Sequence, residues 1–364
     1  MQPARVSPDV RALTLVSFTY LSTPRPHRPM NGHRHVLRLA LLLCTPTLMN
    51  AQAATCTLTG PAAVRGFAAD ACQKGTDIFA FVMPQFAQAL SGGGAILGTA
   101  NTLGGLGKFS LNVRVSAVEG RVPDIDALRL NATGVQATQL ATKESPVPAP
   151  AVDVGVGIFK GFRAGRTQLF SLDGMVNIAY LPDVDVEELK LVVPGERFKF
   201  GYGGRLGLTR DGKLVPAISA SYIRRELPTS DISADFEGGT GGTDRIALSG
   251  FSVTTEAMRL SISKKMAFLE IGGGVGRDTY ETQLNISATI DEGGNTGTAS
   301  TTFAQQLKRD IVYVSAAFNL PLLKLAAEVG QATGGAAVRT VNSFVDGGEG
   351  AARRFASVGV RVSF

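Results

Sequence analysis

Histidine, on which much acid–base and metal chemistry depends, is confined to the start of this chain. The 364-residue sequence contains three histidines, His27, His33 and His35, and all of them precede residue 54. If that first stretch is removed, the mature protein has no imidazole. Ser-His-Asp and Cys-His catalysis, histidine-ligated metals and histidine pH switches are then excluded.

Carboxylates form two clusters that could do chemistry. One contains Asp124 and Asp126, and the other contains Asp183, Asp185, Glu187 and Glu188. Paired carboxylates can hydrolyse glycosidic bonds, and oxygen-rich clusters can bind Ca²⁺ loosely. Both clusters fall in segments that we expect to be exposed loops, where acidic residues are usually solvated. We therefore predict that the protein is not an enzyme and has no catalytic residue, cofactor or metal ligand.

The first 53 residues have the features of an export leader. From Met30 the sequence reads MNGHRHVLRLALLLCTPTLMNAQA, a basic start followed by a short apolar run and a small-x-small ending at Ala53. The apolar run is too short for a membrane-spanning helix, which needs about 20 residues. We predict that residues 1–53 are leader and signal peptide, that Met30 is the true start, and that cleavage follows Ala53.

Positive charge is concentrated in the same leader. Residues 1–53 hold six Arg and one Asp, so they carry +5 of the formal net charge of +6 and leave +1 for residues 54–364. This near-neutral remainder gives no electrostatic reason to expect a nucleic acid partner.

Two cysteines remain after the leader. Cys44 leaves with it, whereas Cys56 and Cys72 lie close to the new N-terminus. Two thiols are too few for a zinc site, which takes four ligands. An even pair in an exported protein is most simply a disulfide, so we expect Cys56 to be bonded to Cys72.

From residue 107 to the end, apolar and polar residues alternate with a period of two. In KFSLNVRVSAV, for example, the apolar positions Phe109 to Ala117 alternate with Ser, Asn and Arg. A soluble antiparallel sheet shows such alternation too, but here the polar face is charged and the runs are long. Runs of about 10 alternating residues separated by turns are typical of outer-membrane barrels. We predict an all-β fold, an antiparallel transmembrane β-barrel formed by residues 107–364.

The spacing of these runs predicts ten strands, at residues 107–118, 149–162, 168–181, 195–209, 213–226, 245–263, 265–288, 308–319, 322–333 and 353–364. Short and long connections alternate between them. The long ones are 119–148, 182–194, 227–244, 289–307 and 334–352, which we expect to be extracellular. Within 265–288 the apolar phase switches at Tyr280, which indicates a bulge or a hairpin there and leaves twelve strands as an alternative.

The polar face of the alternation predicts the side chains that line the barrel lumen. These candidates are Arg114, Asp153, Arg197, Lys199, Arg205, Arg259, Glu270, Glu281, Lys324, Glu328 and Arg361. In a small barrel they could pair and fill the interior, or they could line a narrow polar path.

Residues 54–106 precede the barrel and are rich in Ala and Gly. We expect one helix, at 76–90, with Ile78, Val82 and Phe86 on its apolar face and a kink or break at Pro84. The glycine-rich residues 91–107 should form a flexible strap. An apolar helical face needs cover, so we predict a plug-like segment in which these three side chains close the periplasmic end of the barrel.

The final strand, FASVGVRVSF, resembles the assembly signal at the end of Gram-negative outer-membrane proteins. The resemblance implies that the terminal Phe364 is read by the barrel-insertion machinery. The N-terminal helical segment and SKKMAFLEIGGGVGRDTY also resemble uncharacterised barrels of the long-chain fatty-acid transporter type, over residues 75–364. The family implies a location in the bacterial outer membrane. Its partners would be membrane lipid, the assembly machinery and a small hydrophobic solute.

Two functions are compatible with this sequence. The first is a plugged or gated conduit for a small solute, in which residues 57–106 control the lumen. The second is a structural or adhesin-like protein that acts through its extracellular loops. Barrel enzymes that this chain resembles in shape, such as omptin-like proteases and barrel phospholipases, use a histidine, and residues 54–364 have none.

Overall fold

The structure is a computed structural model that describes residues 54–364, except 125–126, 166, 182, 187–188, 238–242, 336–339, 346 and 349. All described residues belong to one structural unit, Met49–Phe364. The predicted leader, including Met30 and Ala53, lies outside these residues. So do the acidic residues Asp126, Glu187 and Glu188.

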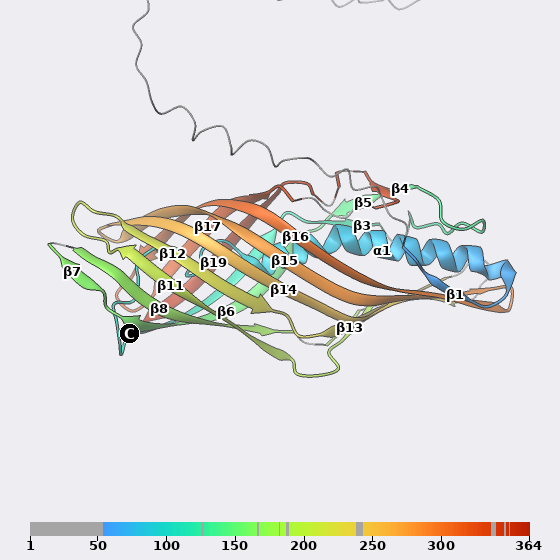
Figure 1. The fold of residues 1–364 in the computed structure, drawn as a ribbon, viewed down its shortest axis with the longest axis horizontal. Coiled ribbons are helices and arrows are strands. Elements are labelled where there is room, and N and C mark those ends of the chain that lie inside the picture. Colours follow the sequence, from blue (N-terminus) through green and yellow to red (C-terminus); the bar gives the residue numbers. More distant parts are fainter. Residues whose placement is uncertain are drawn as a thin grey trace, which may run out of the picture. The chain divides into compact units, whose positions relative to one another are not determined.

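Among the described residues, ten long antiparallel strands close into a ring (Figure 1). In ring order they are β2 (Phe109–Val118), β6 (Val147–Phe159), β8 (Thr167–Tyr180), β11 (Phe198–Thr209), β12 (Ala217–Glu226), β14 (Thr243–Met266), β15 (Leu269–Glu292), β16 (Asn295–Asn319), β17 (Lys324–Thr333) and β19 (Arg353–Ser363). The last strand pairs with the first, from Phe355 opposite Val118 to Ser363 opposite Ser110. Closure satisfies the backbone hydrogen bonds without leaving a sheet edge. The predicted ten-stranded barrel is confirmed.

The connections at one end of the barrel are tight and most of those at the other end are long. The short-turn end contains residues 160–166 with β7 (Phe162–Ala164), 210–216, 267–268 and 320–323. The long-connection end contains β3 (Arg121–Pro123), β4 (Gln139–Leu140), β5 (Thr142–Glu144), β9 (Val184–Val186), β10 (Leu189–Val192), β13 (Ser230–Glu237) and β18 (Ser343–Phe344). Our long connection 289–307 was wrong, because β15 and β16 run on to a two-residue turn at Gly293 and Gly294.

The two faces of the barrel wall have the opposite polarity to a soluble protein. Outward side chains such as Val113, Val314 and Val358 are 53%, 60% and 59% exposed. Inward side chains such as Arg114, Arg205 and Glu328 are each 2% exposed. Exposed apolar surface of this extent needs an apolar solvent, so this band of the wall faces lipid.

The switch of apolar phase in β15 marks the edge of that band and is neither a bulge nor a hairpin. Pairing with β16 continues without a shift from Leu269 opposite Phe318 to Glu292 opposite Asn295. Below the switch, Val275 points outward and is 54% exposed; above it, Leu284 points inward and is fully buried. The outer medium therefore changes from lipid to water along one regular strand, and the inner neighbour changes from polar groups to an apolar helix.

Outward ion pairs mark this boundary on neighbouring strands. Arg277 of β15 contacts Asp310 of β16 at 2.8 Å, and Arg224 of β12 contacts Glu256 of β14 at 2.9 Å. Beyond them, residues 243–256, 277–292 and 295–310 form what we call the projecting sheet, with a polar outer face. Exposed aromatic side chains lie at the opposite edge of the band, where Phe109 stacks on Phe364 and Phe268 on Phe318. An aromatic girdle at the membrane surface is typical of such barrels.

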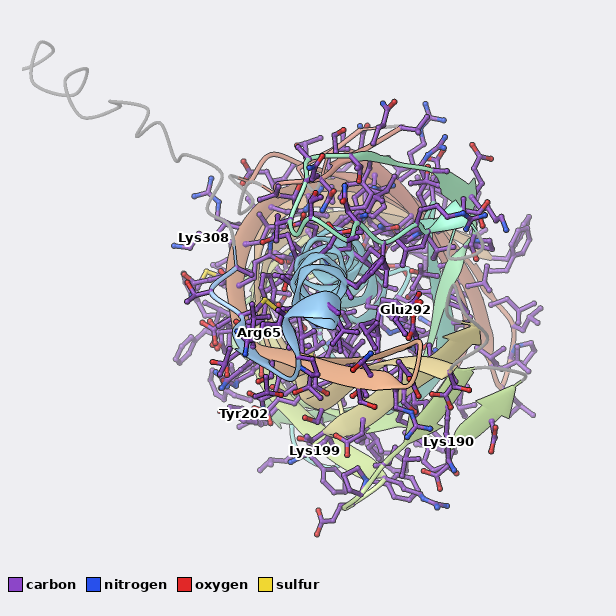
Figure 2. The ribbon with its side chains drawn as sticks, turned by 90° about the vertical axis from the view of Figure 1, so that its right-hand side faces the viewer. Arg65, Lys190, Lys199, Tyr202, Glu292 and Lys308 are labelled. Carbon is purple, nitrogen blue, oxygen red and sulfur yellow. A yellow bond between two sulfur atoms is a disulfide. The ribbon has the colours of Figure 1, made fainter. Side chains whose placement is uncertain are left out.

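Helix α1 (Ala62–Ser91) lies inside the ring (Figure 2). It is 30 residues long and passes through Pro84 without ending, so the predicted break was wrong. The surrounding wall packs on both sides of Pro84, and this packing outweighs the lost helical hydrogen bond. Met83, Ala87 and Leu90 pack against Tyr280, Leu284 and Phe303 of the projecting sheet.

The predicted docking face of the helix was also wrong. Ile78 and Val82 are only half-buried and pack against Phe81 beneath the connections, and Phe86 is 38% exposed. The face with Phe79 and Met83 contacts the barrel instead. The helix occupies the long-connection end and not the short-turn end where we expected it to close the lumen.

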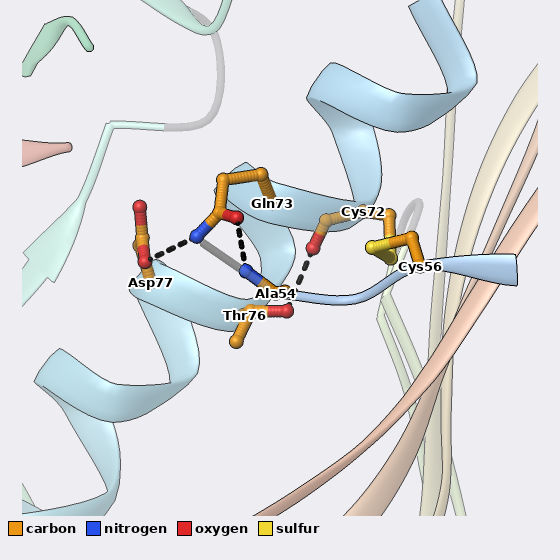
Figure 3. Close-up of a disulfide and its surroundings, with 6 residues drawn as sticks. All are labelled: Ala54, Cys56, Cys72, Gln73, Thr76 and Asp77. Carbon is orange, nitrogen blue, oxygen red and sulfur yellow. Dashed lines mark hydrogen bonds between the residues drawn. A yellow bond between two sulfur atoms is a disulfide. The ribbon is translucent and has the colours of Figure 1, made fainter. Parts of the chain in front are cut away.

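As a result, the described chain begins at the long-connection end. β1 (Thr57–Thr59) pairs with residues 298–300 near the tip of the β15–β16 hairpin. Cys56 is disulfide-bonded to Cys72 of α1 (Figure 3), as predicted. The backbone NH of Ala54 donates to Oε1 of Gln73 at 2.6 Å. From there the chain crosses the lumen before it enters β2 at the short-turn end.

We expect the lipid-facing band to be sensitive to charge and the projecting sheet to tolerate it. Leu325→Arg places a cation in hydrocarbon and should destabilise the barrel by about 2–4 kcal/mol. The matched control, Gln306→Arg, adds the same side chain to the watery outer face of β16 and should change stability little. Urea unfolding from lipid vesicles measures both, and equal costs would contradict the boundary at Arg277.

We also expect the long-connection end to be extracellular, with the start of the mature chain beside it. An epitope inserted after Ala54 or Thr133 should be stained on intact cells, whereas one inserted after Lys213, in a short turn, should not. Staining at Lys213 alone would reverse the orientation of the barrel.

Candidate functional site

The segment that links α1 to β2, residues 92–108, passes through the lumen and is bound there by the barrel wall; we call it the strap. Its upper end begins where the helix ends. Gly92 caps the helix with φ +61 and donates its NH to the Gln88 carbonyl at 3.0 Å. Three successive carbonyl groups, of Ser91, Gly92 and Gly93, would otherwise lack partners at this terminus.

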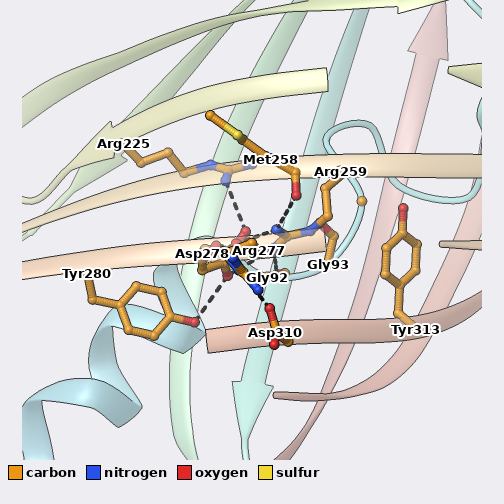
Figure 4. A network of polar contacts seen from close by, with 12 residues as sticks. Gly92, Gly93, Arg225, Met258, Arg259, Arg277, Asp278, Tyr280, Asp310 and Tyr313 are labelled. Carbon is orange, nitrogen blue, oxygen red and sulfur yellow. Dashed lines mark hydrogen bonds and ion pairs between the residues drawn. The ribbon is translucent and has the colours of Figure 1, made fainter. Parts of the chain in front are cut away.

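Two arginines of the wall bind those carbonyl groups (Figure 4). Arg225 Nη1 donates to Ser91 O at 2.9 Å. Arg259 donates from Nη2 to Gly92 O at 3.1 Å and from Nε to Gly93 O at 2.9 Å. Cations are favourable at the negative end of a helix dipole, so the wall stabilises the helix terminus and holds the start of the strap.

Asp278 neutralises Arg259 and completes this cluster. Its carboxylate accepts both guanidinium Nη atoms of Arg259, one of them, Nη2, at 2.9 Å. It also accepts Ser91 Oγ at 2.7 Å and Tyr280 OH at 3.1 Å. Asp278 is fully buried and Arg259 is 3% exposed. We call Ser91, Gly92, Gly93, Arg259 and Asp278 the latch.

Below the latch, buried charges of the wall bind strap groups one after another. Glu328 Oε2 accepts Gly94 NH at 2.8 Å, and Arg361 Nη1 donates to Leu97 O at 3.2 Å. Glu270 Oε1 accepts Thr99 Oγ1 at 2.5 Å and Ser263 Oγ at 2.8 Å. Asp173 accepts Leu103 NH through both oxygens, and Arg205 balances its charge at 2.7 Å. The strap is therefore bound along its length and is not the free segment that its glycine content predicts.

The glycines are needed because the lumen leaves no room for side chains. A Cβ on Gly93 would lie 1.6 Å from Oε1 of Glu328. On the wall, a Cβ on Gly157 would lie 2.2 Å from the backbone oxygen of Gly105 in the strap. Between these points, beside Ile96 and Gly98, a cavity of about 10 Å³ remains. That is room for no more than about one water molecule, so the lumen is closed there.

A larger cavity, of about 320 Å³, opens at the short-turn mouth. Strap residues Thr99, Asn101, Thr102 and Leu103 form part of its lining. The charged residues around it are Arg205, Arg210, Lys265, Lys324, Arg361, Asp211 and Glu270. We call this cavity the vestibule.

The polar side of α1 is covered by the long connections. Lys74 Nζ contacts Asp70 at 2.6 Å and the Arg129 carbonyl at 2.5 Å, with both side chains buried. Asp77 accepts two hydrogen bonds from Asn342, at 2.8 and 2.7 Å. Burial raises the pKa of Asp77 above its usual value, although these bonds partly offset the shift. The helix is thus enclosed by the wall on one side and by loops on the other.

The structure places most of the predicted lumen residues inside the barrel. Arg114, Asp153, Arg205, Arg259, Glu270, Glu328 and Arg361 are buried there, and Arg114 contacts Asp153 at 2.8 Å. Lys324 is half-buried at the vestibule, and Lys199 is half-buried near the other end of β11.

Two lumen assignments were wrong. Arg197 precedes β11 and forms an exposed ion pair with Asp183 at the rim. Glu281 lies on the outer face of the projecting sheet and accepts Gln306 Nε2 at 2.7 Å. It lies beyond the boundary at Arg277, where the alternation keeps its period but exchanges its faces.

Sequence reasoning missed Asp173, Arg225 and Asp278, which hold the strap or balance its partners. The same alternation could have found Asp173, because it lies between the outward residues Leu172 and Gly174. Nothing in the local sequence indicates that Asp278 pairs with Arg259, since their contact depends on the register between β14 and β15.

The closed ring, the outward apolar band and the polar lumen define a transmembrane β-barrel of the bacterial outer-membrane class. Within the described ranges, no helix has the length and apolar character to span a bilayer. The same ranges contain no group of three or more His, Cys, Asp or Glu side chains that could hold a metal ion.

Comparison with known proteins gives neighbours by structure alone. No protein-family model and no curated protein matches the sequence. The outer-membrane protease OmpT from Escherichia coli is 10% identical, with 71% of this chain and 97% of that chain covered and a TM-score of 0.33. The toluene transporter TodX of Pseudomonas putida is 12% identical, with 70% and 88% covered and a TM-score of 0.24. The transport unit of the autotransporter AIDA-I from Escherichia coli is 9% identical, with 71% and 90% covered and a TM-score of 0.28.

These scores are too low to transfer any residue or ligand to this chain. The functional argument has to come from the chain's own lumen.

Removal of Asp278 tests the latch. Asp278→Ala leaves Arg259 as an unpaired buried charge, which should destabilise the folded protein by about 3–5 kcal/mol and make the strap sensitive to protease. The control, Asp235→Ala, breaks an exposed pair with Arg245 and should leave the unfolding midpoint unchanged. Guanidinium unfolding in detergent measures both, and equal midpoints would show that the latch contributes nothing.

Proposed function

We propose that the protein is a plugged conduit of the outer membrane, closed in the observed state, whose strap must move for a small solute to pass. The observation that carries this proposal is the way the strap is bound. The wall holds it through hydrogen bonds from charged side chains to its backbone and short polar side chains, and through few apolar contacts.

The chemistry of the wall favours a movable strap over a permanent filling. Buried ion pairs contribute little net stability, and well-packed apolar residues of the same volume often do better. The lumen nevertheless keeps Arg114, Asp153, Arg205, Asp173, Arg259, Asp278, Glu270 and Glu328. If the strap leaves, water can solvate these charges. An apolar interior exposed in the same way would cost about 25 cal/mol for each Å².

The lining also bears on the kind of solute. We predicted a hydrophobic solute among the candidate ligands, but the vestibule and the strap path are lined by charged and hydroxyl groups. These groups are suited to a polar solute.

Export and assembly complete the proposal. We propose that the leader is cleaved after Ala53, which fits the disulfide between Cys56 and Cys72, since disulfides persist in oxidising compartments. Phe364, 58% exposed at the short-turn end, would be the residue read by the assembly machinery. Because residues 54–364 contain no histidine, we propose that the protein is not an enzyme.

One observation favours the second candidate, a surface-binding protein. The outer face of the projecting sheet carries a shallow cavity of about 450 Å³, lined by Ser252, Thr254, Gln283, Gln305 and their neighbours. Hydroxyl and amide groups on an exposed sheet could bind a polar partner outside the cell. Such a protein would not need a lumen that can open.

Deletion of residues 57–106 tests the conduit directly. The truncated barrel, reconstituted in planar bilayers, should show a stepwise conductance that the intact protein lacks, because the lumen charges then line water. If the folded, truncated barrel conducts no better than the intact one, the conduit is wrong and the surface-binding function is favoured.

A point variant covers the case in which the deletion fails to insert. Gly157→Ala should displace the strap while α1 stays docked, because the new Cβ would clash with the Gly105 backbone. Leak of a small dye from liposomes should rise. Gly195→Ala is the matched control, since a Cβ at Gly195 meets nothing within 4 Å, and a rise with both variants would mean that barrel damage and not strap movement causes the leak.

A further inference from the structure

The vestibule has an excess of positive charge that the protein itself does not neutralise. Five cations, Arg205, Arg210, Lys265, Lys324 and Arg361, surround it against two carboxylates, Asp211 and Glu270. They come from β11, the 210–216 turn, β14, β17 and β19, so the barrel closure brings them together at the short-turn mouth.

Both carboxylates already have partners. Asp211 contacts Lys264 at 2.7 Å, outside the set of five cations. Glu270 accepts Thr99 and Ser263 with one oxygen, and its other oxygen lies 4.0 Å from Lys324 Nζ. Asp173, which pairs with Arg205, lies behind the strap at Leu103. Even if Asp173 and Lys264 are included, the balance of the vestibule stays positive.

One of these cations also has an unused donor. Arg361 is 3% exposed, and its Nη1 donates to the Leu97 carbonyl at 3.2 Å. Its Nε is buried and has no hydrogen-bond partner among the described residues. A buried donor without a partner costs free energy, and an acceptor placed in the vestibule would remove that cost.

The size and chemistry of the cavity select the ligand class. A volume of about 320 Å³ is at the lower end of the usual range for ligand sites, about 300–1,000 Å³. Guanidinium and ammonium groups bind carboxylate and phosphate oxygens through short, charge-assisted hydrogen bonds. The hydroxyl and amide groups of Thr99, Thr102 and Asn101 on the strap side can bind further polar atoms.

We propose that the vestibule binds a small soluble polyanion bearing phosphate or carboxylate groups, and that this is the class of solute the conduit admits. The second clause rests on the proposed function; the binding site itself does not. An anion in the vestibule would compete with Glu270 for Lys324, and Glu270 holds the strap at Thr99. Occupancy would therefore weaken one of the contacts that keep the strap in place.

Binding is measured on the full mature protein in a zwitterionic detergent, by calorimetric titration with inorganic phosphate and with citrate. The double variant Lys265→Gln/Lys324→Gln should bind either anion at least about tenfold more weakly, since each lost charge within a few Å of the anion weakens the attraction. The matched control is Lys190→Gln/Lys308→Gln, which removes two exposed lysines of the long-connection half (Figure 2) and should bind as the unmodified protein does.

Equal affinity in the two double variants, or no heat with either anion, would overturn the proposed site. Thermal unfolding of each variant shows whether weak binding reflects a damaged barrel. Reversal potentials of the 57–106 deletion test the solute class separately, and we expect anions to be favoured over cations. If the anions bind but the deletion does not conduct, the site stands and the conduit fails; if it conducts without either anion binding, the conduit stands and the site fails.

Discussion

The closed state depends on the buried contact between Arg259 and Asp278. It joins two neighbouring strands of the wall, satisfies the terminal carbonyl groups of α1 and fixes the start of the strap. A buried guanidinium without its carboxylate would be costly, and a helix end without donors would be costly too. Each of these problems is solved by the other. The position of the helix in the lumen and the path of the strap follow from this arrangement.

The second organising constraint is the surface of the membrane, which crosses β14, β15 and β16 partway along their length. These strands keep one register while the medium outside them changes from lipid to water. Inside, the same strands change from binding a polar strap to packing on an apolar helix. The plug is therefore divided in two: the helix is held by apolar contacts outside the membrane band, and the strap is held by charged groups within it.

This division has a consequence for opening. The helix and the disulfide between Cys56 and Cys72 can stay docked against the projecting sheet, because their contacts do not involve the lower lumen. The strap can be released separately, since the groups that bind it remain hydrated when exposed to water. The vestibule lies at the mouth nearest to the lower strap, so a solute that binds there acts on the movable part and not on the fixed part.

The sequence by itself determined the barrel, its ten strands, the alternation of faces and the disulfide. These features depend on local periods of two and on turn residues, which a chain carries in any environment. Only the tertiary structure decided which medium each face meets. Glu281 shows this, because its position in the alternation matches a lumen residue, yet it lies beyond the boundary at Arg277 and faces water outside.

The course of the N-terminal segment was likewise decided by tertiary contacts. Glycine-rich sequence predicted a flexible strap and Pro84 predicted a broken helix, because local propensity favours both. The enclosing wall reversed each outcome: it packs around Pro84, and it supplies charged partners to a backbone that only glycine could bring close enough. Contacts such as that between Asp278 and Arg259 arise from strand register and closure, which no single segment of the sequence encodes.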